Sequence, residues 1–88
     1  MGVLLSTDLD RDDAVPYFLW DEPMTVAELR RRLREGSTTE RSRLLAKVLR
    51  EARDRDVWRF TTPAAVARDW ELLAPHLGRS RAFWEYLL

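Results

Sequence analysis

The fold is decided by residues 25–52, which read TVAELRRRLREGSTTERSRLLAKVLREA and contain two helix start signals. The first signal begins at Thr25, whose hydroxyl can cap a helix, and Glu28 three residues later completes a capping box. The second signal begins at Ser37 and has the same spacing. Gly36 stands between them as a natural helix terminator. The stretch therefore predicts two helices joined by about one to three residues, packed as a helical hairpin or a helix-turn-helix corner.

Both of these helices have one apolar face. In the first, Val26, Leu29 and Leu33 recur at the helical period. The stripe of the second consists of Leu44, Leu45, Val48, Leu49 and Ala52. The remaining positions are rich in arginine, so each helix is expected to bury one face and to expose the other.

Two more helices are expected towards the C-terminus. Thr62 is an N-cap followed by Pro63 at the first helical position, and Pro75 ends that helix. Its expected buried face consists of Val66, Trp70 and Leu73. Residues 79–88 are apolar almost all round, which predicts a last helix buried on several sides. Residues 57–61 are expected to form a loop with anchored aromatic side chains.

The N-terminal segment carries no helix signal. Residues 1–14 are rich in charge and show no apolar period, which predicts an acidic flexible tail. Residues 15–20 are apolar but bounded by prolines, so we expect an extended segment that inserts its aromatic side chains elsewhere. The predicted architecture is all-α: a small single domain over residues 15–88, with about four helices and an extended N-terminal arm.

Composition excludes several classes of function. The 88 residues include no cysteine, which removes disulfides, thiolate metal sites and thiol nucleophiles. One histidine, His76, and three isolated glycines predict neither a zinc site nor a phosphate-binding loop. We therefore expect no enzyme, with no catalytic residue, metal or cofactor. The chain lacks an apolar run of the roughly 20 residues that span a membrane, and its first five residues are too short for a signal-peptide core, so a cytoplasmic location is expected.

Charge is segregated along the chain although the net charge is zero. Residues 1–29 carry seven acids and one base, a net charge of −6, and residues 30–59 carry eleven bases and five acids, a net charge of +6. This asymmetry indicates either an interaction surface or two segments that neutralise each other across the fold, and both readings stay open. The candidate electrostatic contacts are Asp8, Asp10, Asp12, Asp13, Arg30, Arg31 and Arg34.

Aromatic residues indicate a protein partner more sharply than the charges do. Four of the 88 residues are Trp, three are Phe and two are Tyr, which together with the leucines is more than we expect so small a core to hold. Trp and Tyr are enriched at interface hot spots. We assign Trp58 and Trp70 to the core. The candidate partner-binding residues are Tyr17, Phe18, Trp20, Phe83, Trp84, Tyr86 and Leu87.

Three stretches of the chain resemble one protein family. They are residues 16–30 (PYFLWDEPMTVAELR), 44–58 (LLAKVLREARDRDVW) and 77–87 (LGRSRAFWEYL). In them the chain resembles the antitoxin partner of MenAT-type (AbiEii-like) nucleotidyltransferase toxins, which modify tRNA. The resemblance implies an antitoxin that binds and neutralises a cognate toxin by direct protein–protein contact, in a hetero-oligomer, and it carries over no catalytic residue.

Two other functions stay open. The basic helices within residues 26–55 could bind phosphates in a DNA-binding transcriptional autoregulator. The C-terminal helices could pair with those of a second copy in a homodimeric interaction scaffold. Zero net charge favours a protein partner over nucleic acid, because nucleic-acid-binding domains are usually basic overall. For the antitoxin, one mechanism is that the acidic residues 8–22 occupy a basic groove of the toxin.

Overall fold

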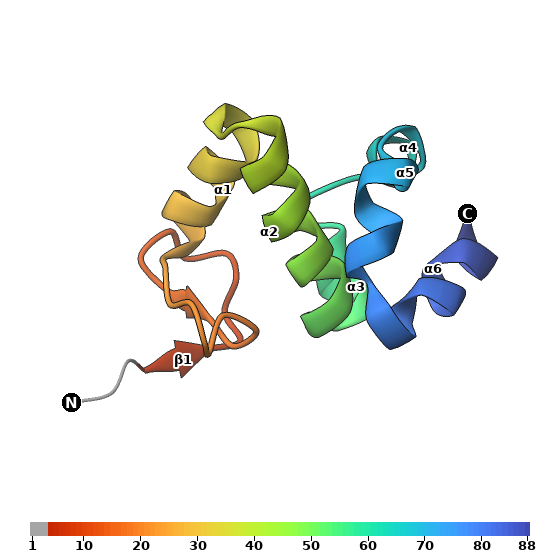
Figure 1. Cartoon of the computed structure of the whole chain (residues 1–88). Helices are drawn as coiled ribbons and strands as arrows, with labels where there is room; N and C mark the ends of the chain where they lie inside the picture. The colour runs from red at the N-terminus through yellow and green to blue at the C-terminus, as the bar shows by residue number, and fades with distance from the viewer. Residues whose placement is uncertain (1–3) are drawn as a thin grey trace.

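The computed structural model describes residues 4–88, which form six α-helices, two 3₁₀ helices and one pair of very short strands (Figure 1). In chain order they are β1 (Leu5–Ser6), β2 (Val15–Pro16), α1 (Val26–Glu35), α2 (Thr38–Glu51), α3 (Asp54–Val57), α4 (Pro63–Arg68), α5 (Trp70–Leu73), η1 (Ala74–His76), η2 (Gly78–Ser80) and α6 (Arg81–Leu87). The mainly helical class is confirmed, with the parallel β1–β2 pair added to it. No helix of these residues is long and apolar enough to cross a bilayer.

The two predicted helix starts are both confirmed. The Thr25 hydroxyl accepts a hydrogen bond from the Glu28 N–H, and the Ser37 hydroxyl accepts one from the Glu40 N–H, each at 3.1 Å. Gly36 ends α1 as predicted, but its backbone is extended (φ −67°, ψ 166°) and not left-handed. Glycine is needed there for space, because a Cβ atom would lie 2.6 Å from the carbonyl oxygen of Arg32.

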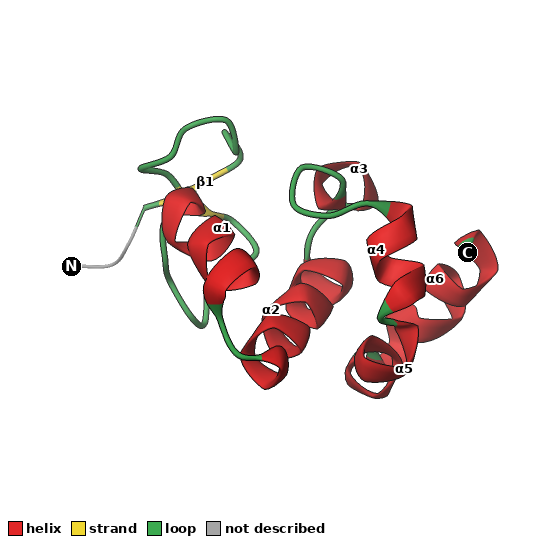
Figure 2. Cartoon of the chain, turned by 90° about the horizontal axis from the view of Figure 1, so that it is seen from above, coloured by secondary structure: helices red, strands yellow, loops and turns green. Residues whose placement is uncertain are grey.

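Helix α2 is the centre of the domain. It lies between α1 on one side and α4 to α6 on the other (Figure 2). Leu44 and Val48 of the predicted stripe are fully buried and Leu49 is 2% exposed, while Leu45 and Ala52 pack at its margin. Val66 and Leu73 join this core from α4 and α5. The apolar period therefore placed the core correctly, because helical residues three and four apart share one face.

Residues 4–14, expected as an acidic flexible tail, are anchored on the domain at Leu9 and Ala14, while most of their other side chains are exposed. Leu9 is 2% exposed and Ala14 is 8% exposed, both within the core. The same loop completes the start of α1, since the Val26 N–H donates to the Ala14 carbonyl at 2.8 Å and the next N–H donates to the Asp12 carbonyl at 3.1 Å. The first N–H groups of a helix need acceptors outside it, and this loop supplies two. Residues 1–3 of the predicted tail lie outside the described residues.

The expected N-terminal arm is also part of the core. β2 pairs in parallel with β1, with Leu5 opposite Val15. Phe18 is 1% exposed, and its ring packs edge-on between those of Tyr17 and Phe60, at centroid distances of 5.3 and 5.8 Å. Only Val15 and Pro16 are extended, so the prediction of an extended segment over residues 15–20 is wrong for the rest. A turn follows them, in which the Leu19 N–H donates to the Pro16 carbonyl at 3.0 Å. The segment closes one end of the α1–α2 corner instead of projecting from the domain.

The C-terminal half is more broken than predicted. The expected helix after Thr62 is interrupted at Asp69 and divides into α4 and α5. Gly78, with φ of +54°, turns the chain between η1 and α6. The prediction that the last helix is buried on several sides is wrong, because Trp84 is its only buried residue.

Candidate partner-binding surface

Helix α6 is fixed to the domain through Trp84. This side chain is 1% exposed, and its indole N–H donates to the carbonyl oxygen of Leu49 at 2.9 Å. Leu49 lies in the last turn of α2, where carbonyl groups have no partner within the helix. The rings of Trp58 and Phe83 pack edge-on against Trp84, with centroids 5.6 and 5.1 Å away. These contacts hold α6 in one orientation on the end of α2.

A second face of α6 is apolar and exposed. Phe83, Tyr86 and Leu87 are 46, 88 and 51% exposed. They are spaced i, i+3 and i+4, so they share one side of the helix, and we call them the C-terminal stripe. Trp58 and Leu88 are also exposed, at 40 and 47%. Exposed apolar side chains that share one side of a helix are typical of a contact surface for another macromolecule.

The predicted aromatic contacts divide between core and surface. Phe18 and Trp84 are buried, so their assignment to a partner surface is wrong. Tyr17 is half-buried: its hydroxyl donates to Asp56 Oδ2 at 2.6 Å and accepts from the Arg53 N–H at 2.8 Å, and burial raises its pKa. Trp20 is exposed. Trp20 therefore remains a candidate contact, together with the three residues of the C-terminal stripe.

The acidic side chains are mostly paired within the chain. Asp10 bonds Arg59 across 49 positions of sequence. Asp13 pairs locally with Arg11 at 3.1 Å, and the Asp8 carboxylate accepts the Asp10 N–H at 3.3 Å. The Asp12 carbonyl belongs to the loop that completes α1. This arrangement matches the reading in which the two charged segments neutralise each other.

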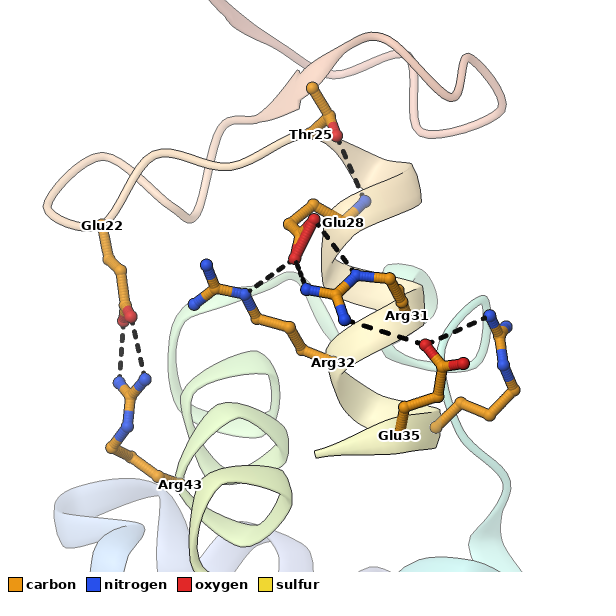
Figure 3. A network of polar contacts seen from close by, with 8 residues as sticks. Glu22, Thr25, Glu28, Arg31, Arg32, Glu35 and Arg43 are labelled. Atoms are coloured by element: carbon orange, nitrogen blue, oxygen red, sulfur yellow. Dashed lines mark hydrogen bonds and ion pairs between the residues drawn. The ribbon is translucent and has the colours of Figure 1, made fainter. Parts of the chain in front are cut away.

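The strongest of these ion pairs joins the N-terminal segment to α2. Both carboxylate oxygens of Glu22 accept hydrogen bonds from Arg43 at 2.8 Å (Figure 3). The Lys47 ammonium lies 2.6 Å from Asp21 and 3.3 Å from Glu22. Bidentate pairs of this kind are among the stronger hydrogen bonds in proteins.

The basic residues on α1 have partners of their own. Arg31 and Arg32 both donate to the Glu28 carboxylate, and Arg31 also approaches Glu35 at 3.8 Å (Figure 3). Arg30 donates to the Arg59 carbonyl at 2.7 Å, and its guanidinium lies 4.8 Å from the centre of the Phe60 ring. Arg34 reaches Glu35 only at 4.0 Å.

The Glu22–Arg43 pair predicts a defined loss of stability in acid. Hydrogen bonding to Arg43 lowers the pKa of Glu22 from 4.5 to about 2 in the folded protein. A lowered folded pKa stabilises the fold above the unfolded pKa, and the contribution is lost as pH falls from about 4.5 to about 2. After allowance for solvent screening, we expect Glu22→Gln to lower the free energy of unfolding at pH 7 by about 1–2 kcal/mol.

Urea unfolding between pH 2.5 and 7 tests this, because the difference between the two proteins should disappear towards the acid end. Glu71→Gln is the matched control, since Glu71 is exposed and forms no ion pair within residues 4–88. A constant difference across the whole pH range would contradict the assignment.

Two features of the surface were missed from the sequence. Lys47 lies outside the predicted apolar stripe of its helix, on the face expected to be exposed, yet it is only 6% exposed. Two features of the sequence could have indicated this burial. Lys47 lies three residues after Leu44 and so near the apolar face of the helix, and the consecutive acids Asp21 and Glu22 could pair with it. Trp58 was assigned to the core. Its ring packs against that of Trp84, but the side chain is 40% exposed.

Within residues 4–88, no cluster of three or more His, Asp and Glu side chains is placed to hold a metal ion. Comparison with known protein families, with curated proteins and with solved structures finds no match. A functional assignment therefore has to be argued from the residues themselves and from the surface that they form.

Proposed function

We propose that this chain is an antitoxin that binds a cognate, tRNA-modifying nucleotidyltransferase toxin and neutralises it by direct contact. The observation that carries the proposal is the C-terminal stripe, an exposed apolar helix face that the buried Trp84 attaches to the domain. The stripe lies within residues 77–87, one of the three stretches that resemble the antitoxin family. Local geometry and the resemblance thus indicate the same segment.

Apolar contact is the better-supported mode of binding. Burial of a phenylalanine or leucine side chain contributes about 1.5–3 kcal/mol, so the stripe can supply the centre of an interface. A standard interface covers about 800 Å² on each partner, which requires further side chains beyond the stripe. The acidic residues 8–22 are weaker candidates, because four of their carboxylates already have cationic partners in the chain.

The structure gives the DNA-binding alternative less support than the sequence alone did. Most arginines of α1 and α2 meet a carboxylate of the same chain, which lowers the positive potential available to phosphates. A homodimer through α6 remains a separate outcome, since the stripe does not by itself select its partner.

Co-expression with the product of the adjacent reading frame, which the proposal expects to be the nucleotidyltransferase, tests the proposal. We expect a stable complex in which transfer of nucleotides to tRNA is suppressed. If the chain purifies alone and folded, with no effect on nucleotidyl transfer, the antitoxin assignment is wrong. Sedimentation as a dimer would then favour the homodimeric scaffold, and retardation of operator DNA would favour the autoregulator.

A further inference from the structure

A groove separates the α1–α2 corner from the α4–α5 pair. Leu33, Leu45, Phe60 and Leu72 line it from four different parts of the chain, and its volume is about 280 Å³. A second hollow of about 240 Å³ shares Leu33 and Phe60 with the first and therefore lies beside it, and we call the two together the groove. No residue of α6 lines either hollow, which separates the groove from the C-terminal stripe.

The floor of the groove fits aliphatic side chains. Leu33, Leu45 and Phe60 are partly buried and Leu72 is 47% exposed, so a branched apolar side chain entering the groove would displace water from all four. Phe60 is the only aromatic residue of the lining, and the guanidinium of Arg30 already covers its ring at 4.8 Å. The face of Phe60 that Arg30 covers is therefore closed to stacking by a nucleic-acid base.

The rim of the groove is positively charged. Its charged lining residues are Arg30, Arg34, Arg41, Arg68 and Asp69. Asp69 is neutralised by Arg68 at 3.2 Å. Arg41 forms no ion pair within residues 4–88, and Arg34 has only the contact of 4.0 Å to Glu35. Arg30, Arg34 and Arg41 thus leave a net positive charge at the groove, although Arg53 and Arg55, outside it, also form no ion pair within residues 4–88.

We propose that the groove binds an acidic amphipathic segment of a protein partner. Leucine-like side chains of that segment enter between Leu45 and Leu72, and its carboxylates face Arg34 and Arg41. Charged hydrogen bonds from arginine then fix the register, while the apolar floor provides the affinity. This site is additional to the C-terminal stripe and does not depend on the antitoxin assignment.

The probe is a synthetic helical peptide of about 14 residues with leucines on one face and glutamates on the other. Titration into the isotope-labelled full chain, followed by two-dimensional NMR, should shift the amide signals of Leu45, Phe60 and Leu72. The signals of the C-terminal stripe should stay unchanged. Arg41→Glu should weaken binding by about tenfold or more, because it places like charges against each other. Leu72→Ser should also weaken binding, because it removes an apolar side chain from the floor of the groove. Leu72 is 47% exposed, so the variant should still fold.

Arg79→Glu is the matched control, since it makes the same charge change at an exposed residue outside the groove, and it should bind the peptide like the unmodified chain. The proposal is overturned if the peptide shifts no groove signal at about millimolar concentration. It is equally overturned if Arg41→Glu binds as well as Arg79→Glu, or if a peptide with lysines in place of the glutamates binds as tightly. Tighter binding of a single-stranded oligonucleotide in the same groove would show that the ligand class is wrong.

Discussion

Replacement of Trp84 by alanine is expected to detach α6 and to lower the free energy of unfolding by about 3–5 kcal/mol. Trp84 is the only buried residue of α6, so no other side chain of that helix can take over its role. The change removes the packing against Trp58 and Phe83 and the hydrogen bond to the Leu49 carbonyl. The freed carbonyl adds a further cost wherever water cannot reach it.

Urea unfolding followed by circular dichroism measures the effect. A chain of this length is stabilised by about 4–13 kcal/mol, so Trp84→Ala should unfold at much lower urea or be partly unfolded without it. Trp84→Phe keeps part of the packing and should fall in between. Tyr86→Ala is the control on the same helix, and because Tyr86 is 88% exposed its effect should stay within about 0.5 kcal/mol. Equal midpoints for Trp84→Ala and Tyr86→Ala would mean that α6 is held in another way.

For the proposed antitoxin, the paired replacement of Phe83 and Leu87 by serine is expected to weaken binding of the toxin by about 10- to 150-fold. The two side chains belong to the C-terminal stripe and are about half exposed in the free chain, so loss of about 0.7–1.5 kcal/mol from each gives this factor. Because Phe83 also packs against Trp84, circular dichroism should first show that the double variant keeps the fold. Calorimetric titration of the purified nucleotidyltransferase with each variant measures the affinity.

Arg81 and Glu85 provide the matched control for that experiment. They are exposed, they lie on the same helix, and they form an ion pair at 3.7 Å. Their joint replacement by serine changes two α6 side chains outside the stripe and should alter the affinity by less than about tenfold. If this control weakens the complex as much as the Phe83 and Leu87 change does, the loss is not specific to the stripe, and the assignment of the stripe as the centre of the interface is wrong.

The elements that could be predicted are those whose causes are local in sequence. Thr25 and Ser37 cap helices because each hydroxyl meets an N–H only three residues away. The stripe from Leu44 to Ala52 predicted the buried face of α2, because helical periodicity needs no information from the rest of the chain. Pro63 and Gly36 likewise placed a helix start and a helix end.

The residues of the candidate surface could not be predicted one by one, because aromatic residues two positions apart in the sequence are buried in one case and exposed in the other. Phe18 is buried and Trp20 is exposed, and Trp84 is buried while Tyr86 is exposed. These residues have similar chemistry, and composition alone cannot separate the aromatic side chains of a core from those of an interface. The sequence therefore indicated the correct segments and assigned two of their residues to the wrong side.

By itself the sequence determined the mainly helical class, the α1–α2 corner and the face of α2 that forms the core, because each depends on residues within one or two helical turns. Only the tertiary structure decided which aromatic side chains are buried, why Lys47 is buried, and where positive charge remains unpaired. Those outcomes depend on distant partners: Trp84 bonds Leu49 across 35 positions, and Tyr17 bonds Asp56 across 39. Burial and charge pairing are properties of the packed chain, and a local pattern does not contain them.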